Sequence, residues 1–60
     1  MKRETYSRHS MYLKLRNQNI HFEWPQFLDY EEFYFQWNSE RKLEIWAIGN
    51  NEDKLVGYFL

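Results

Sequence analysis

Hydrophobic and polar residues alternate along residues 11–24, and this alternation predicts a β-hairpin. Two apolar triplets carry the pattern: Met11, Leu13 and Leu15, then Ile20, Phe22 and Trp24. A period of two is the signature of a strand with one buried face. Pairing Leu15 with Ile20 puts both triplets on the same face, and the turn then falls on residues 16–19, which contain two Asn.

The period becomes helical after Pro25, over residues 26–38. A proline fits the first turn of a helix, because the N–H group that it lacks has no partner there. Aromatic residues recur at helical spacing and form one core-facing stripe: Phe27, Tyr30, Phe33, Tyr34 and Trp37. Asp29 and Glu32 have the spacing of a capping box. Leu28 and Phe35 fall outside the stripe, so we expect them to contact another molecule.

A second hairpin is predicted over residues 43–48 and 54–60, joined by the turn-forming residues 49–53. Its strands are apolar on both faces. One face holds Leu43, Ile45, Ala47, Leu55 and Phe59, and the other holds Trp46, Ile48, Val56, Tyr58 and Leu60. Such strands are usually buried on both sides. A single helix covers one face, so we expect the other to fold inward or meet another molecule, with a free strand edge at residues 58–60.

Together these elements predict an α+β fold. It is a small single domain over residues 1–60, ββαββ in order, with two antiparallel hairpins flanking one aromatic-rich helix. Residues 1–7 are expected to form a flexible basic arm. The chain has 13 aromatic residues and no Cys in 60 residues. A domain of this size buries only ~60% of the surface of its unfolded chain, so some rings are expected to lie at the surface.

The net charge of −1 conceals two halves of opposite sign. Residues 1–22 contain five Lys or Arg and one Glu, a net of +4, whereas residues 23–60 contain three Lys or Arg and eight Asp or Glu, a net of −5. Either the two halves attract each other within the fold, or each meets a partner of opposite charge. With no Cys and no long apolar run, we expect a soluble cytoplasmic protein that does not enter a membrane.

Candidate catalytic chemistry is scarce. His9 and His21 have no carboxylate at metal-ligand spacing and no Cys to join them, which argues against a zinc site or a nucleophile–base pair. Glu31 and Glu32 are neighbours on different faces of the predicted helix, so they do not form an acid–base pair. We therefore expect no enzyme activity, no cofactor, no metal and no small-molecule substrate.

The segment Lys54-Leu55-Val56-Gly57-Tyr58 resembles the strand that runs into a Val-Gly-aromatic segment in the GNAT family of N-acetyltransferases. The resemblance covers residues 43–60, less than a third of the chain. The glycine-rich loop with which that family binds coenzyme A is absent, since Gly49 and Gly57 are the only glycines. The resemblance implies a hairpin and nothing about activity.

The surplus of aromatic and apolar residues favours a protein-binding module, because Trp and Tyr often dominate binding energy. The candidate protein-binding residues are Leu28, Phe35, Trp46, Ile48, Val56 and Tyr58. The partner is either a foreign protein or a second copy of the chain, as in a homodimeric structural or accessory protein. A composition rich in Asn, Lys, Tyr, Phe and Glu fits a bacteriophage or another mobile element, and favours an anti-defence inhibitor that occludes a host protein in the host cytoplasm.

Binding of single-stranded nucleic acid is the alternative function. Basic residues interleaved with aromatic rings can track phosphates while the rings stack on bases. The candidate nucleic-acid-binding residues, on the basic face of the first hairpin, are Arg8, His9, Tyr12, Lys14, Arg16 and His21. The slightly acidic net charge argues against this function, because nucleic-acid-binding domains are usually clearly basic.

Overall fold

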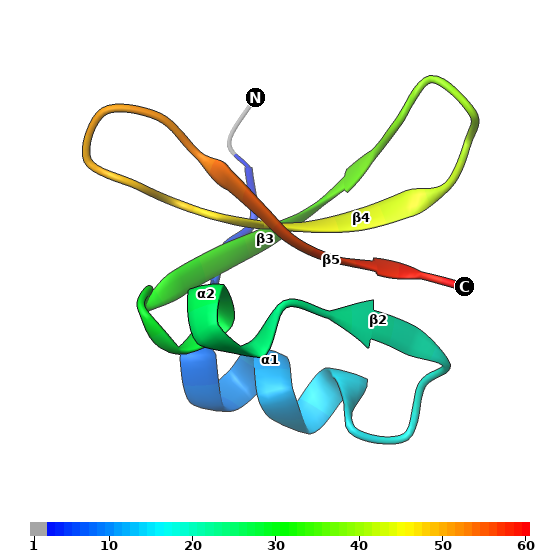
Figure 1. Cartoon of the computed structure of the whole chain (residues 1–60), viewed down its shortest axis with the longest axis horizontal. Helices are drawn as coiled ribbons and strands as arrows, with labels where there is room; N and C mark the ends of the chain where they lie inside the picture. Colours follow the sequence, from blue (N-terminus) through cyan, green and yellow to red (C-terminus); the bar gives the residue numbers. More distant parts are fainter. Residues whose placement is uncertain (1–2) are drawn as a thin grey trace.

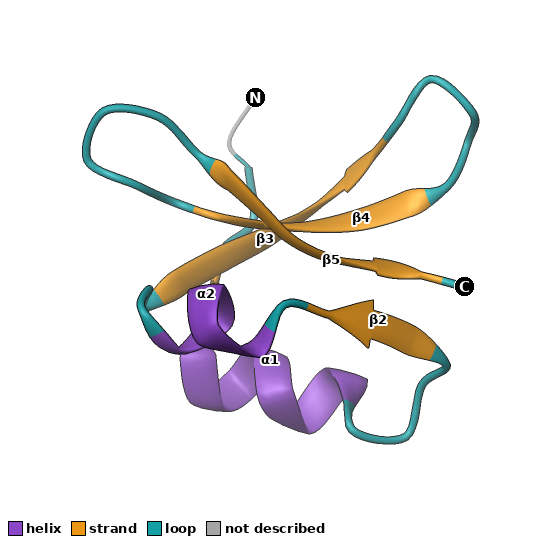
Figure 2. Ribbon diagram, in the orientation of Figure 1, coloured by secondary structure: helices purple, strands orange, loops and turns teal. Residues whose placement is uncertain are grey.

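The computed structural model describes residues 3–60 and shows an antiparallel five-stranded sheet with two helices packed on one side, an α+β fold (Figure 1). In chain order the elements are β1 (Tyr6–Ser7), α1 (Arg8–Leu15), β2 (Ile20–Phe22), α2 (Trp24–Leu28), β3 (Glu32–Trp37), β4 (Leu43–Ala47) and β5 (Lys54–Phe59). The strand order in the sheet is β1-β3-β4-β5-β2. Both helices lie below the sheet in Figure 2.

The predicted hairpin over residues 11–24 is wrong, because residues 8–15 form helix α1. The side chain of Ser7 caps this helix by accepting a hydrogen bond from the backbone N–H of Ser10 at 3.2 Å. Met11 and Leu15, four residues apart, are both buried on the sheet side of the helix. Leu13 is exposed on the outer side. The spacing of the apolar residues fits both a strand and a helix. The Ser7 cap and the packing of Met11 and Leu15 against the sheet favour the helix.

Strand β2 pairs with β5, not with the preceding segment. Its register sets Ile20 opposite Phe59 and His21 opposite Tyr58. The amide of Leu60 also donates to the carbonyl oxygen of Asn19 at 3.0 Å. The expected free edge at residues 58–60 is therefore wrong, because β2 covers it.

The helix predicted over residues 26–38 is also wrong beyond its first turns. Helix α2 contains Pro25 in its first turn, as expected, but it ends at Leu28 with Asp29 as its C-cap. Residues 32–37 then form β3, which pairs with β4 from Phe33 to Trp37. Glu32 therefore belongs to a strand, and the predicted capping box does not form. Phe33 and Phe35 also alternate with Tyr34, and aromatic residues favour strands. Pairing with the next strand, β4, decides between the two compatible periods.

The second hairpin is confirmed as β4 and β5, but its faces differ from the prediction. A bulge interrupts the pairing: Trp46 lies opposite Leu55 and Ile45 lies opposite Gly57, which leaves Val56 as the extra residue. Val56 is fully buried, and Leu55 is exposed. The extra residue reverses the faces predicted for Leu55 and Val56.

Gly57 makes this bulge close-packed against the neighbouring strand. A Cβ atom at this position would lie 2.7 Å from the carbonyl oxygen of His21 and 3.1 Å from the ring of Phe22. No side chain fits into that gap. The glycine therefore lets β2 approach β5 closely enough to complete the sheet.

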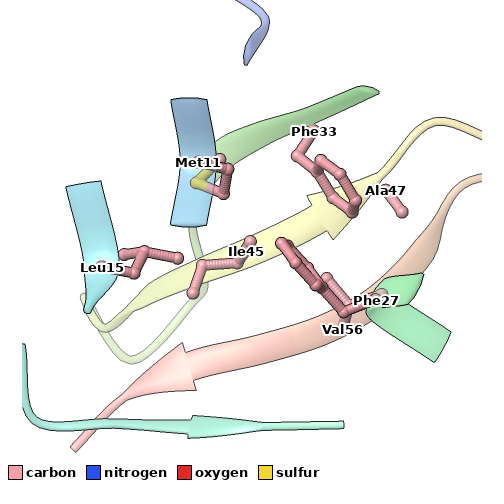
Figure 3. Close-up of a cluster of buried hydrophobic side chains, with 7 residues drawn as sticks. All are labelled: Met11, Leu15, Phe27, Phe33, Ile45, Ala47 and Val56. Carbon is pink, nitrogen blue, oxygen red and sulfur yellow. The ribbon is translucent and has the colours of Figure 1, made fainter. Parts of the chain in front are cut away.

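The hydrophobic core lies between the helices and the sheet (Figure 3). Its members come from α1, α2 and the three central strands: Met11, Leu15, Phe27, Phe33, Ile45, Ala47 and Val56. The rings of Phe27 and Phe33 stack with their centroids 4.6 Å apart. No polar or charged residue is buried among residues 3–60. The core is small and entirely apolar. Burial of each of its large side chains contributes about 1.5–3 kcal/mol to the stability of the fold.

The observed order is thus βαβαβββ in place of ββαββ, with two short helices in place of one long helix. Within the predicted basic arm, Tyr6 and Ser7 form β1 and pair with β3. The arm also includes Met1 and Lys2, which lie outside the described residues. Neither α1 nor α2, the helices found within residues 3–60, has the length and apolar character needed to cross a membrane.

Candidate functional site

The side of the sheet that faces away from α1 and α2 carries a row of aromatic and polar side chains, which we call the open face. Cross-strand pairing places these residues side by side, since directly opposite residues project to the same face. Trp46 pairs with Tyr34 on one side and with Leu55 on the other, and Tyr58 lies between Glu44 and His21. The open face consists of His21, Tyr34, Gln36, Glu44, Trp46, Leu55 and Tyr58.

The indole of Trp46 is held in place by a carboxylate on its own strand. Its Nε1 donates a hydrogen bond to Oε1 of Glu44 at 3.0 Å, and the other oxygen of Glu44 accepts from Nδ2 of Asn38 at 3.0 Å. With its polar edge satisfied, the half-buried ring offers an apolar surface to the solvent side. Trp46 is therefore a preorganised aromatic group at the centre of the open face.

Tyr58 and His21 extend this row toward the β2 edge. Their rings stack with centroids 5.0 Å apart and an angle of 26° between the planes. Nε2 of His21 lies 3.1 Å from Oε1 of Glu23, which fixes the imidazole against the phenol ring. Tyr58 is 40% exposed. Together with Trp46 and Leu55, Tyr58 forms an accessible apolar strip, bordered by the carboxylates of Glu44 and Glu23.

Tyr34 is the exception on the open face, because it is only 3% exposed. Its hydroxyl donates to Oδ2 of Asp53 at 2.6 Å, and the guanidinium of Arg3 lies 3.9 Å from its ring centroid and 3.6 Å from the same carboxylate. Asp53 also accepts from the amide of Gly49 at 3.3 Å. Burial, and then the hydrogen bond to Asp53, raise the pKa of Tyr34. This cluster ties the N-terminal segment and the β4–β5 loop to the sheet.

The structure brings only part of the predicted protein-binding set together. Trp46 and Tyr58 share the open face, and half-buried Ile48 directly follows β4. Leu28 is 58% exposed, but it lies at the end of α2 on the helix side. Val56 is fully buried in the core.

Phe35 also lies on the helix side of the sheet. Its ring packs against Tyr6 at 5.6 Å and against Phe59 at 6.2 Å between centroids. Half-buried in this way, it contributes to the edge of the core and not to the open face.

Sequence reasoning missed Leu55 and His21 as members of the open face. Leu55 was assigned to the opposite face because strict alternation carries no sign of a bulge. The isolated Gly57 inside an apolar strand was the available signal, since such glycines often mark bulges or close approaches. His21 reaches the open face only because β2 pairs with β5, a long-range contact that no local pattern indicates.

The predicted nucleic-acid-binding residues do not form one surface. Nη1 of Arg8 donates to the carbonyl oxygens of Leu28 at 2.7 Å and Tyr30 at 3.0 Å, and Nζ of Lys14 lies 4.9 Å from the ring centroid of Tyr6. Both cationic side chains therefore make contacts within the fold. His21 lies on the open face, across the sheet from α1, and His9 is exposed on α1.

Two members of that set do line a groove between α1 and β2. Tyr12 and Arg16 line it together with Trp24, which was expected on the apolar face of the first hairpin, and the centroids of the Tyr12 and Trp24 rings lie 6.3 Å apart. The groove has a volume of about 260 Å³ and is completed by Leu15, Gln18, Ile20 and Phe22. It combines exposed aromatic surface with one guanidinium.

No group of three or more His, Asp or Glu side chains within residues 3–60 is arranged to hold a metal ion. The open face carries an aromatic surface and carboxylates. Comparison of the chain with family models, with curated proteins and with solved structures found no match.

Proposed function

We propose that this protein is a non-enzymatic protein-binding module that covers a partner surface with its open face. The observation that carries the proposal is the strip of Trp46, Leu55 and Tyr58 on a sheet face that neither helix covers. Trp and Tyr are the residues most often found at the energetic centre of protein interfaces. The hydrogen bond from Trp46 to Glu44 fixes the indole in advance, which lowers the entropy cost of binding.

The charges around this strip indicate the chemistry of the partner. Glu44 lies within it and Glu23 borders it beside His21, whereas Asp53 at its other end is already paired with Arg3. A surface with these carboxylates repels phosphate groups and attracts Lys and Arg. The partner that fits is therefore a protein surface with an apolar centre and basic residues around it.

In this proposal the module acts by steric occlusion, as an inhibitor or modulator of a host protein or defence system. The support for a phage or mobile-element origin is the composition alone, which is rich in Asn, Lys, Tyr, Phe and Glu. An occluding inhibitor needs a rigid binding face and no catalytic group. A small sheet with a preorganised aromatic strip fits that requirement.

The experiment that tests the proposal is affinity capture from host lysate with four forms of the protein. They are the wild type, Trp46→Ala, Tyr58→Ala and, as the matched control on the helix side, Leu28→Ala. We expect one basic partner, identified by mass spectrometry, to be retained by the wild type and by Leu28→Ala. Each open-face variant should retain at least about tenfold less of it, as befits a hot-spot residue.

Equal capture of the same partner by all four folded forms would overturn the proposal, because the open face would then contribute nothing to binding. Circular dichroism of each variant establishes that it is folded. Once the partner is known, its affinity should change little with salt if the apolar strip dominates. A steep loss with salt would mean that the carboxylates dominate.

Single-stranded nucleic acid remains the second proposal, at the groove of Tyr12, Arg16 and Trp24. Two exposed rings beside a guanidinium suit a stacked base and its phosphate. Fluorescence titration with a labelled oligothymidylate tests it. Binding that weakens steeply with salt and disappears in Arg16→Ala supports this function, and absence of binding at low salt contradicts it.

A further inference from the structure

One edge of the sheet is only partly covered. Strand β1 pairs with the outer side of β3 at Phe33 and Glu32, and residues 3–5 form no further ladder with β3. Arg3 contacts Tyr34 and Asp53 on the open face. Within residues 3–60, the outer side of residues 34–37 therefore has no paired strand. Such an edge presents free backbone donors and acceptors for strand addition.

The direction of the backbone groups along β3 follows from two hydrogen bonds. The carbonyl oxygen of Glu32 accepts from the amide of Ile48 at 2.9 Å, and the amide of Asn38 donates to the carbonyl oxygen of Lys42 at 2.9 Å. Even-numbered residues of this strand therefore turn their N–H and C=O groups toward β4. Phe35 and Trp37 turn theirs outward, to the uncovered edge.

The two residues with outward backbone groups, Phe35 and Trp37, carry large apolar side chains. Trp37 is 67% exposed, and it lines a shallow apolar hollow with Leu43, Phe59 and Leu60 on the helix side of the sheet. Phe35 is only half-buried next to it. A strand that pairs with these free backbone groups would also bury the apolar surface of the exposed Trp.

We propose that two copies of this chain associate through antiparallel pairing of β3 with β3, about a two-fold axis at Gln36. Phe35 then lies opposite Trp37 of the second copy, and Trp37 lies opposite the second copy's Phe35. The outward N–H and C=O groups of both residues pair across the axis. The two sheets join into one, with all helices on one side and both open faces on the other.

Two other registers conflict with the structure. A pairing centred on Phe35 would set Trp37 opposite Phe33 of the second copy, and Phe33 already pairs with Tyr6. A pairing shifted by one residue would put the helices of the two copies on opposite sides and would misalign the outward groups. The centre at Gln36 uses both outward residues and conflicts with neither β1 nor the turn after Asn38.

A second copy fits this edge because the edge is self-complementary. The window is four residues long, bounded by β1 at one end and by the β3–β4 turn at the other. A strand that enters it antiparallel must carry two outward-facing residues and leave the sheet at both ends. The same four residues of β3 have this form, and cross-strand pairs of Phe and Trp are among the favourable ones. The proposal does not depend on the open face, which stays free in the dimer.

The first test is the molar mass of the intact protein by light scattering, over a concentration series up to roughly 1 mM, where even a complex of millimolar affinity forms. We expect twice the chain mass of 7.7 kDa. Trp37→Pro removes an outward N–H that makes no bond to β4, so it should fold and return the mass to 7.7 kDa. Tyr58→Ala, on the open face, should leave the dimer unchanged.

A pair of charge variants tests the position of the axis. Gln36 is exposed and would face its own copy across a close pair, so like charges there repel. Gln36→Glu and Gln36→Lys should each self-associate more weakly by roughly two- to five-fold. An equimolar mixture should associate at least as well as the wild type.

A wild-type protein that stays monomeric throughout the series would overturn the proposal. So would a dimer that is unaffected by Trp37→Pro and by both Gln36 variants, because that dimer would use another surface. If Trp46→Ala loses partner capture but keeps the molar mass of the wild-type dimer, the dimer proposal is supported and the open-face proposal is tested independently of it. The two proposals therefore fail separately.

Discussion

The two faces of this sheet carry the same kinds of residue in different environments. On the helix side, Phe27, Phe33 and Ile45 are packed into a core with no polar group among the described residues. On the open side, each ring has a polar partner: Tyr34 has Asp53, Trp46 has Glu44, and Tyr58 stacks on His21. Aromatic content alone therefore does not separate folding from binding. What distinguishes the open side is that neither α1 nor α2 covers it (Figure 2).

This difference has an energetic consequence. The core side chains on the helix side are removed from water by folding itself, so they contribute to the free energy of unfolding. On the open side, Trp46, Leu55 and Tyr58 keep part of their apolar surface in water, and that surface is available to a partner. Substitutions on the two sides should therefore affect different measurements, and the following experiments separate the two sides in order of expected effect.

The largest loss of stability is expected for Phe33→Ala. The ring is fully buried and stacks on Phe27, so its removal leaves a cavity and should lower the free energy of unfolding by about 3–5 kcal/mol. Urea denaturation measures this loss, with Leu28→Ala as the exposed control that should stay within about 0.5 kcal/mol of the wild type. A loss below about 1 kcal/mol for Phe33→Ala would mean that the core lies elsewhere.

A smaller loss is expected for Gly57→Ala, which acts at the boundary between the two sides. The added Cβ would lie 2.7 Å from the carbonyl oxygen of His21, so β2 must move away from β5. We expect a cost of about 1–3 kcal/mol from overpacking. The same shift should loosen the stack of His21 on Tyr58, which nuclear magnetic resonance of the two rings would detect. An unchanged stack and unchanged stability would contradict the close approach at the bulge.

The smallest stability effect is expected for Tyr34→Phe. It removes the hydrogen bond to Asp53, which should cost about 1 kcal/mol. The pKa of Tyr34 is raised in the folded protein above its ordinary value of 10.0, first by burial and then by this hydrogen bond. Its stabilisation is therefore fully present below pH 10.0 and is lost as the pH rises through the folded pKa.

Denaturation of the wild type and of Tyr34→Phe from neutral pH to about pH 11, a range that spans the ordinary tyrosine pKa, measures this pH dependence. The difference in stability between the two proteins should shrink as the pH passes above 10.0. A difference that stays constant or grows over that range would contradict the account of this cluster.

The C-terminal hairpin was predictable from sequence because its pairing is local. Residues 43–48 and 54–60 are apolar, and a turn-forming loop between them brings β4 and β5 together. Only the bulge was missed, since an extra residue such as Val56 leaves the composition unchanged and reverses the faces that alternation predicts.

The N-terminal part was not predictable in the same way, because its apolar spacing fits two structures. Met11 and Leu15 suit one face of a strand and one face of a helix equally well. Phe33 and Trp37 suit both periods too. Tertiary contacts decide: β3 becomes a strand because it pairs with β4, the next strand in the chain, and α1 packs over that sheet. The Ser7 cap was a local signal for the helix and could have been used.

The candidate site also contains residues that local patterns indicate and residues that only the strand order brings together. Trp46 and Tyr58 were identified from composition and position, because Trp and Tyr in a strand with a second apolar face indicate exposure. His21 and the Arg3 contact with Tyr34 depend on the strand order β1-β3-β4-β5-β2, in which the first and last strands come from the N-terminal half. No local pattern encodes that order.

The most direct test of the division between the two faces compares Ile45→Ala with Trp46→Ala, because these neighbours project to opposite sides of β4. The measurement is the free energy of unfolding of both variants in urea. We expect Ile45→Ala to lose about 2–5 kcal/mol, or to unfold, and half-buried Trp46→Ala to lose less than about 1.5 kcal/mol. An equal or larger loss for Trp46→Ala would make the open face part of the folding core and would contradict its role as a binding surface.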